Sequence, residues 1–261
     1  MPTPLDILLD PAALVTMGLF AALMLWEALA PARPLPAVRG WRLKGIAALL
    51  VYLMIASYLP LLWDAHFARW QPVDLEHLPV WAAAAIGFLV YEVVAYGYHR
   101  ALHRFTPMWR VLHQMHHSAE RLDVASAFWF SPLDVAGWTL VTSLALVLGV
   151  GLSPEAAKAT LFALTFLGIF THANVRTPRW LGFLVARPES HALHHARGVH
   201  AFNYCDLPLI DMLFGTFRNP RGFPAATGFW DGASARVVDM LRFADVSEPH
   251  VDRPARRLAR A

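Results

Sequence analysis

Residues 79–103 of the chain read PVWAAAAIGFLVYEVVAYGYHRALH, an apolar run that ends in two histidines. Residues 79–97 are long enough for a helix that crosses the hydrocarbon core of a bilayer, which takes about 20 residues at about 1.5 Å of rise each. If the helix continues, His99 and His103 are four residues apart and project from one face. The stretch therefore predicts a membrane-spanning helix that carries two imidazoles at the membrane boundary.

Four other apolar stretches qualify as candidate spans, of which the last is the shortest: residues 11–30, 44–63, 134–152 and 156–171. Of the 261 residues, 57% are apolar and 16% are charged. Soluble domains carry about 45–50% apolar and about 25% charged residues, so the composition favours a membrane protein over an ordinary soluble enzyme. We expect an all-α, polytopic membrane bundle of four to five spans. Ser153 and Pro154 predict an N-cap and a first helical position between the last two stretches.

The positive charges predict the orientation of the bundle. With the N-terminus outside, 20 of the 22 Lys and Arg residues fall on the inner side, and only Arg69 and Lys158 fall outside. Positive residues accumulate on the cytoplasmic side, so we expect a multi-pass protein of the bacterial inner membrane with the histidine clusters and the C-terminus in the cytoplasm. No Lys or Arg precedes the first apolar stretch, which is therefore interpreted as a span and not as a signal peptide.

We expect a single membrane-embedded catalytic domain over residues 1–232, with a histidine-rich core at about 91–220. An Arg-rich tail, residues 233–261, is expected to lie on the membrane surface or to be partly disordered. No tract resembles a nucleic-acid-binding motif, and the topology explains the basic pI of 9.3, so no nucleic-acid partner is expected.

Ten of the 13 histidines fall between residues 99 and 200. Besides the H-x3-H pair, the spacing H-x2-H-H occurs twice, over residues 113–117 and 191–195, and in both cases a proline at the start of a helix precedes it. Single histidines stand at His172 and His200. A single cysteine, Cys205, excludes a disulfide framework and a cysteine-ligated cluster.

So many neutral imidazoles exceed the needs of one ion, because tetrahedral zinc takes four ligands and octahedral sites take six. We therefore predict a cytoplasmic helical cap that carries a histidine-rich dinuclear metal site. Imidazole suits iron, copper, nickel or zinc, and the spacing alone leaves this choice open. The predicted ligands are His99, His103, His113, His116, His117, His172, His191, His194 and His195.

With these motifs the chain resembles the fatty acid hydroxylase and sterol desaturase superfamily of integral-membrane di-iron oxygenases. Over about residues 91–220, the three histidine motifs stand in the family's order, and further matches occur at residues 171–174, 203–204 and 211–216. The resemblance implies O2-dependent hydroxylation or desaturation of a lipid, such as a fatty acyl chain or sterol, at two Fe ions. Arg176 stands where relatives with a full H-x3-H motif have a histidine, so Asn174 is added as a possible metal contact beside His172. His200, just beyond the last motif, is added as a possible metal or substrate contact.

Ligating imidazoles normally donate their outer N–H to a carbonyl or carboxylate. Glu92 is a candidate for this role near the end of a span, and Asp211 and Asn203 are candidates in the cap, where they are also expected to hold the cap together through buried hydrogen bonds. The aromatic run Phe128, Trp129 and Phe130 is interpreted either as a membrane anchor or as the frame of a lateral substrate entrance from the bilayer.

Two other functions stay open at this stage. A zinc-dependent membrane hydrolase is less well supported because the chain has no His-Glu-x-x-His sequence. A non-enzymatic metal-binding or haem-binding membrane protein is less well supported because the histidines gather on one side of the spans. The chain also has no Gly-x-Gly-x-x-Gly fingerprint, so an oxygenase would take its electrons from a separate reductase or carrier. Recombinant material can contain zinc in place of iron.

Overall fold

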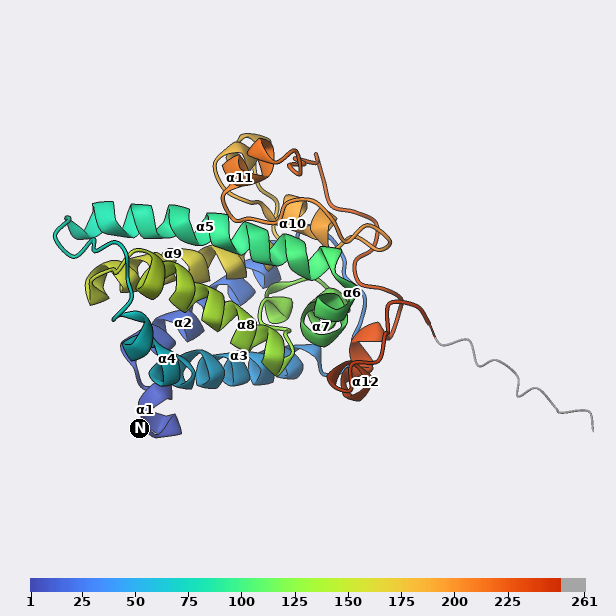
Figure 1. Cartoon of the computed structure of the whole chain (residues 1–261). Helices are drawn as coiled ribbons and strands as arrows, with labels where there is room; N and C mark the ends of the chain where they lie inside the picture. Colours follow the sequence, from blue (N-terminus) through green and yellow to red (C-terminus); the bar gives the residue numbers. More distant parts are fainter. Residues whose placement is uncertain (250–261) are drawn as a thin grey trace, which may run out of the picture.

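The computed structural model describes residues 1–249, and in that range the chain is helical apart from turns and loops (Figure 1). Its only pairing of extended backbone is an isolated antiparallel bridge between Ala196 and Thr227. The prediction of an all-α fold is confirmed. The α-helices are α1 (Pro4–Leu8), α2 (Pro11–Leu29), α3 (Trp41–Tyr58), α4 (Pro60–Phe67), α5 (Val80–Arg104), α6 (Thr106–Met108), α7 (Gln114–His117), α8 (Pro132–Ser143), α9 (Pro154–His172), α10 (Pro188–His194), α11 (Pro208–Leu213) and α12 (Val237–Leu241).

Shorter helical turns complete the chain. Two are π-helical, η1 (Trp109–His113) and η3 (Leu144–Gly149), and η3 extends α8 to Gly149. Three are 3₁₀-helical: η2 (Val124–Ser126), η4 (Arg179–Phe183) and η5 (Ala233–Ala235).

Five long helices, α2, α3, α5, α8 and α9, run side by side and form the bundle (Figure 1). Three of them begin in the same way, with a polar N-cap followed by proline at the first helical position. The cap side chains are Asp10 for α2, Ser131 for α8 and Ser153 for α9, and each accepts a hydrogen bond from a backbone N–H of the first turn. Proline loses nothing there because its missing N–H would have no helical partner. The predicted start at Ser153 and Pro154 is confirmed.

Four helical segments are long and apolar enough to cross a membrane: Pro11–Leu29, Trp41–Phe67, Val80–Arg104 and Pro132–Gly149. Their apolar side chains face outward, as shown by Trp81, which is 77% exposed, and Leu43, which is 73% exposed. Such surfaces are stable when lipid covers them. The fifth predicted span corresponds to α9, whose 19 residues pack between α5 and α2 and whose first turns carry Glu155 and Lys158.

The right-hand ends of α3, α5 and α8 in Figure 1 lie near the short helices α6, α7 and α12. The short helix α10 packs against α9. Helix α5 continues past the predicted span to Arg104, so that both His99 and His103 are helical. A backbone hydrogen bond of 2.8 Å from Ala32 to Asn174 joins the segment after α2 to the segment after α9. The end that carries the histidines is therefore built from segments far apart in the chain.

The predicted domain boundary after Gly232 falls inside packed structure. Helix α12 packs against α7 and η1, and Met240 and Val246 are each 1% exposed. Gln114 donates to the carbonyl oxygen of Ala244 at 2.9 Å, and the indole of Trp230 donates to that of Val246 at 2.9 Å. Residues 233–249 thus belong to the packed cap because their apolar side chains fit against the segment that carries the second histidine motif. The remainder of the predicted tail lies outside the described residues.

Candidate metal centre

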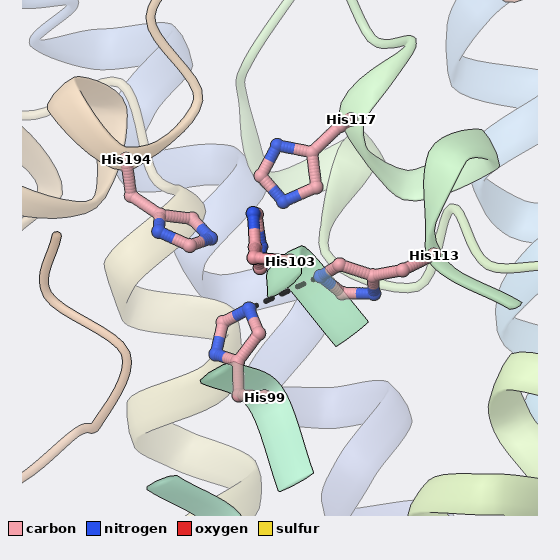
Figure 2. A group of neighbouring side chains, drawn as sticks. All are labelled: His99, His103, His113, His117 and His194. Atoms are coloured by element: carbon pink, nitrogen blue, oxygen red, sulfur yellow. Dashed lines mark hydrogen bonds between the residues drawn. The ribbon is translucent and has the colours of Figure 1, made fainter. Parts of the chain in front are cut away.

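The nine predicted ligands gather at one end of the bundle in two groups, and within each group one ring nitrogen of every member lies within 4.8 Å of the others. The five-histidine group, drawn in Figure 2, comprises His99, His103, His113, His117 and His194. The four-histidine group comprises His116, His172, His191 and His195. Helix α5 supplies two members of the first group, and the last turn of α9 supplies His172 to the second.

Each H-x2-H-H motif is divided between the two groups. His113 and His117 join the five-histidine group while His116 joins the other. In the second motif the pattern is reversed, since His191 and His195 share the four-histidine group and His194 crosses to the five-histidine group. The two histidines that are four residues apart thus point to the same group, and the histidine three residues after the first points to the other group. Each motif therefore connects the two groups rigidly.

The rings of the five-histidine group are held from behind by one loop. Backbone carbonyl oxygens at alternate residues of 200–204 accept hydrogen bonds from Nδ1 of His103, His194 and His99, at 2.8, 2.7 and 2.9 Å. The loop bends with left-handed backbone at His200, Phe202 and Asn203, whose φ angles are 41°, 71° and 49°. Such conformations cost energy for residues other than glycine, so surrounding contacts must hold them.

A carboxylate holds a fourth ring. Nδ1 of His113 lies 2.9 Å from Oδ2 of Asp134, and both side chains are buried. Asp134 stands in the first turn of α8, directly after the Ser131 cap. Sequence reasoning missed this residue, because it treated Asp134 as the first position of a span. The available signal was an acidic residue at a predicted span end on the histidine side.

The donor set of the five-histidine group fits a metal ion. A neutral imidazole has one N–H, and in both His99 and His113 the Nδ1 atom faces an oxygen acceptor, so the hydrogen lies on Nδ1 and Nε2 is a bare lone pair. These two Nε2 atoms lie 3.1 Å apart, the contact dashed in Figure 2. Two lone pairs at that distance repel one another unless a cation lies near both. Within residues 1–249, Nε2 of His103, His117 and His194 is also buried without a hydrogen-bond partner.

The four-histidine group has the same character. His172 donates from Nδ1 to the carbonyl oxygen of Gly168 at 2.7 Å, which leaves its Nε2 bare. That atom lies 3.3 Å from Nε2 of His116 and 3.1 Å from Nε2 of His191, which in turn lies 3.1 Å from Nε2 of His195. Four converging ring nitrogens form the kind of donor set that binds a first-row transition metal.

Burial keeps these rings in the neutral state that binds metal. The pKa values of His116, His117, His194 and His195 are lowered well below the usual histidine value, chiefly by burial. Neighbouring imidazoles add to the effect, because a second positive charge beside the first is unfavourable. Metal binding requires deprotonated ligands, so the site is prepared for an ion at neutral pH.

A cavity of about 180 Å³ adjoins both groups. His99 and His113 line it from the five-histidine group, and His116, His172 and His191 line it from the four-histidine group. Most of the remaining wall is apolar or aromatic and comes from α3, α5, α8 and α9, with Tyr52, Ala95, Val135, Trp138, Leu161, Leu164 and Ile169 among its members. Residues of the segments 127–130 and 203–206 complete the wall.

The three predicted entrance aromatics have different places. Phe128 and Phe130 line the cavity, and the ring of Phe130 stacks on His116 with 4.2 Å between centroids. Trp129 lies elsewhere: it packs on Trp41 at 5.3 Å, and its indole donates to Ser118. The reason is geometric, since successive residues of this turn point to different sides.

The predicted supporting residues act through the loop between α10 and α11. Asp211 accepts hydrogen bonds from the backbone N–H groups of Tyr204 and Cys205 at 2.9 and 3.0 Å. Glu92 accepts from the N–H of Leu207 at 2.8 Å and also lines the cavity. Asn203 donates to the carbonyl oxygen of Ser190 at 2.9 Å. Among the described contacts, none of the three carboxylate or amide groups touches an imidazole directly.

His200 and Asn174 both lie outside the two groups. Nδ1 of His200 lies 3.1 Å from Nδ1 of His117, so His200 contacts a predicted ligand on the ring nitrogen that faces away from the five-histidine group. Asn174 faces a second cavity on the other side of the α9 end, where its Nδ2 donates to the carbonyl oxygen of Arg33 at 2.8 Å. Its backbone N–H donates to Glu27. The structure therefore gives Asn174 a position away from the histidines.

Comparison with known proteins agrees with this geometry. The sequence profile described as "Fatty acid hydroxylase" matches residues 84–216, slightly more than half of the chain, and the match contains all nine histidines. The chain belongs to the fatty acid hydroxylase family. The family resemblance that the histidine motifs indicated is thereby confirmed.

Two curated relatives of this fatty acid hydroxylase family member have names that state an activity. An ornithine lipid hydroxylase, OlsE, of Rhizobium tropici is 32% identical over 151 residues, which cover 56% of this chain and 44% of the relative. A Delta(7)-sterol-C5(6)-desaturase of Nicotiana tabacum is 29% identical over 162 residues, which cover 60% of this chain and 57% of the relative. The chain thus spans about half the length of these relatives. No solved structure matches it significantly.

Proposed function

We propose that the protein is a membrane-bound, O2-dependent di-iron oxidoreductase that hydroxylates or desaturates a lipid. The observation that carries the proposal is the meeting of two histidine groups, with five and four converging imidazoles, at one largely apolar cavity inside a membrane bundle. The named activities of the two relatives, hydroxylation of a lipid and desaturation of a sterol, agree with it.

In this proposal the five-histidine group holds one iron ion and the four-histidine group holds the other. When bound, the two ions supply the activation of O2 that is needed to oxidise an unactivated C–H bond. Hydroxylation consumes one O2, two electrons and two protons, places one oxygen atom in the lipid and releases one water. Desaturation consumes the same reagents, removes two hydrogens from the lipid and releases two waters.

The chain's own residues orient the ligands and exclude water. The carbonyls of residues 200, 202 and 204 and the carboxylate of Asp134 fix the tautomers of four of the five rings in the five-histidine group. The stacked ring of Phe130 and the apolar part of the wall limit the access of water beside His116. A dry cavity limits side reactions of the oxidant with solvent.

The lipid is proposed to enter from the bilayer. Leu161 lines the cavity and is also 42% exposed on the surface of α9, so the cavity wall and the lipid-facing surface share this residue. An acyl chain or a ring system that enters there reaches the histidines without passing through water. The proposed orientation, with the histidines and C-terminus in the cytoplasm of a bacterial cell, follows from the charge distribution.

Iron is favoured over the zinc hydrolase and over the metal carrier by the family assignment. The nine-imidazole donor set also differs from the usual hydrolytic zinc site, in which three protein ligands leave one position open. Zinc in purified material would show only which metal was abundant during expression.

The test combines metal analysis with lipid analysis. Purified protein is expected to bind about two iron ions per chain and to consume O2 with lipid only when a separate reductase or electron carrier is added to NAD(P)H. A strain that lacks the gene is supplied with the wild-type gene on a plasmid. Compared with the lipids of the strain that lacks the gene, its lipids are expected to contain one more oxygen atom or two fewer hydrogens. The matched control is the same strain with His117→Ala. Identical lipid mass spectra for the two strains, or turnover with NAD(P)H alone, would contradict the proposal.

A further inference from the structure

A second cavity, of about 530 Å³, lies outside the histidine centre, at the same end of the bundle. It is bounded by the end of α2, the segment that leads to α3 and the segment that follows α9. Its lining residues are Glu27, Ala28, Pro31, Ala32, Arg33, Pro34, Leu35, Arg42, Arg121, Asp123 and Asn174. Because α2 and α3 are membrane-spanning candidates, the cavity lies at the depth of the lipid headgroups.

Most of the polar groups in this cavity that still lack a hydrogen-bond partner are donors. Three arginines face two carboxylates, and both carboxylates already have partners. Oε2 of Glu27 accepts from the backbone N–H groups of Val124 and Asn174, each at 3.0 Å. Asp123 accepts from the indole of Trp41 at 2.8 Å and pairs with Arg121. Three guanidinium groups against two carboxylates leave the cavity with an excess positive charge, and neither Arg33 nor Arg42 has a carboxylate partner among the ion pairs of residues 1–249.

Arg33 is held in place, and one edge of its guanidinium has no hydrogen-bond partner in the described part of the chain. Its guanidinium lies 4.7 Å from the ring centre of Phe223, and Nη1 donates to the carbonyl oxygen of Pro224 at 2.6 Å. Across residues 1–249, its Nε and Nη2 atoms are buried and have no hydrogen-bond partner. These two atoms form the edge that binds two oxygens of a phosphate or carboxylate at once. A fixed guanidinium loses little freedom on binding such an anion.

Asn174 adds a specific acceptor. Its Nδ2 donates to the carbonyl oxygen of Arg33, which fixes the orientation of the amide, and its Oδ1 is buried without a partner in the described part of the chain. A hydroxyl group next to the anion satisfies that oxygen. Ala28 and Leu35 give the same cavity an apolar portion.

We propose that this cavity binds the headgroup of a phosphate-bearing lipid that carries a hydroxyl group, with the phosphate on Arg33 and Arg42 and the hydroxyl on Asn174. Free phosphate offers the same anionic chemistry, whereas a lipid also uses the apolar portion. The proposal is independent of the metal centre, since it concerns binding and not oxidation.

The test uses full-length protein in detergent with three probes: phosphatidylglycerol, phosphatidylcholine and inorganic phosphate. Binding is read from the unfolding midpoint and from lipid adducts in native mass spectrometry. Phosphatidylglycerol is expected to raise the midpoint and to remain attached, and phosphatidylcholine is not. Loss of a two-point, charge-assisted contact costs about 1.5–3 kcal/mol, so Arg33→Gln should need at least about tenfold more phosphatidylglycerol for the same shift.

Two further variants make the result decisive. Arg42→Gln changes an exposed side chain that lines the cavity, so it is expected to weaken binding while the protein folds normally, even if Arg33→Gln does not fold. Arg39→Gln is the matched control, because Arg39 is an exposed arginine of the same segment and is outside the described lining of the cavity. It should behave like wild type.

The outcomes separate the sources of the anion. An Arg33-dependent shift with inorganic phosphate alone supports the site and identifies free phosphate as an occupant. Equal effects of phosphatidylglycerol and phosphatidylcholine would overturn the proposal. So would equal responses of Arg33→Gln, Arg42→Gln and Arg39→Gln to phosphatidylglycerol.

Discussion

His117 and His195 are the residues at which the two histidine groups come into closest ring contact. Their imidazoles stack with 4.1 Å between centroids and 13° between planes, and each ring belongs to a different group. Both are fully buried. A substitution at either position therefore removes one donor from one group and leaves a cavity against the other.

We expect His117→Ala and His195→Ala each to abolish lipid oxidation while the protein stays in the membrane. Each variant should also bind less metal than wild type, because each removes a donor from a different group. Metal content per chain and lipid mass spectra provide the measurements. His66→Ala, at an exposed residue of α4, is the control and should keep both properties. Full turnover in either buried variant would show that the residue is not a ligand.

Asp134→Asn tests the support of a ligand without removing it. The amide keeps the size of the carboxylate but is a weaker acceptor for the N–H of His113. Loss of such outer hydrogen bonds commonly lowers metal affinity about 10–100-fold. We expect a weakening in this range in an iron titration of metal-free protein. Asp74→Asn, in an exposed loop, should leave the titration unchanged, and an unchanged titration for Asp134→Asn would contradict its supporting role.

The spacing of the histidines in the sequence predicted the ligands but not the residues that support them. All nine predicted ligands lie in the two groups. Eight of them belong to the H-x3-H and H-x2-H-H motifs, whose helical spacing brings imidazoles together, and the ninth, His172, was predicted from its place at the end of a span. Asp134 was not predicted, since its contact to His113 depends on how α8 packs beside η1. Asn174 and Trp129 face away from the histidine cavity, because the direction of a side chain in a turn depends on backbone angles that sequence does not reveal.

Among the elements, α3 and η2 make an unusually close approach. A Cβ atom on Gly45 of α3 would lie 2.4 Å from the backbone oxygen of Ala125. That oxygen cannot move without moving η2, which lies next to the aromatic run that lines the histidine cavity. A small residue is therefore required where this helix meets the loop.

We expect Gly45→Ala to destabilise the protein by about 1–3 kcal/mol, the usual cost of overpacking. Gly18→Ala is the matched control. Gly18 also lies inside a membrane-spanning helix, but a methyl group there would meet no atom of a neighbouring described residue within 4 Å. Alanine is the better helix former, so Gly18→Ala should be neutral or slightly stabilising. Thermal unfolding in detergent compares the two. Equal midpoints would refute the close approach.

Helix starts and the extent of the bundle were predictable because caps and hydropathy are local signals. The Ser153 cap and the membrane-spanning character of α5 are confirmed. The packing of residues 233–249 against α7 was not predicted, because composition marked this segment as a charged tail while Met240 and Val246 supply the buried contacts. The division of each H-x2-H-H motif between two groups likewise depends on tertiary packing.

For the whole molecule, we expect metal binding to be coupled to folding. Nine imidazoles from α5, η1, α7, α9 and α10 and the residue after it converge, so an ion that binds them holds these elements together. A ligand that binds only the folded state adds about 2.7 kcal/mol of stability at a concentration 100 times its Kd. Removal of metal by a chelator should therefore lower the unfolding midpoint, and added iron should restore it.

The metal-free protein should also be sensitive to acid. Burial lowers the pKa values of His117 and His195 in the folded state, while the unfolded chain has the usual value of about 6.5. Below that pH the unfolded chain binds more protons, so stability is highest above pH 6.5 and falls as the pH decreases. Unfolding midpoints of chelator-treated protein between pH 8 and pH 5 measure this. A midpoint that rises on acidification would contradict the burial of neutral rings.

The loop over residues 200–204 has a consequence for variation among relatives. It orients three imidazoles with main-chain oxygens, and a main-chain oxygen is present whatever the side chain is. Exchanges there can be tolerated as long as the path of the chain is kept, and glycine suits the φ of 71° at Phe202 at least as well as phenylalanine does. The side chains of this loop can thus change during evolution, and with them the surface beside the histidine cavity, while the orientation of the three rings stays the same.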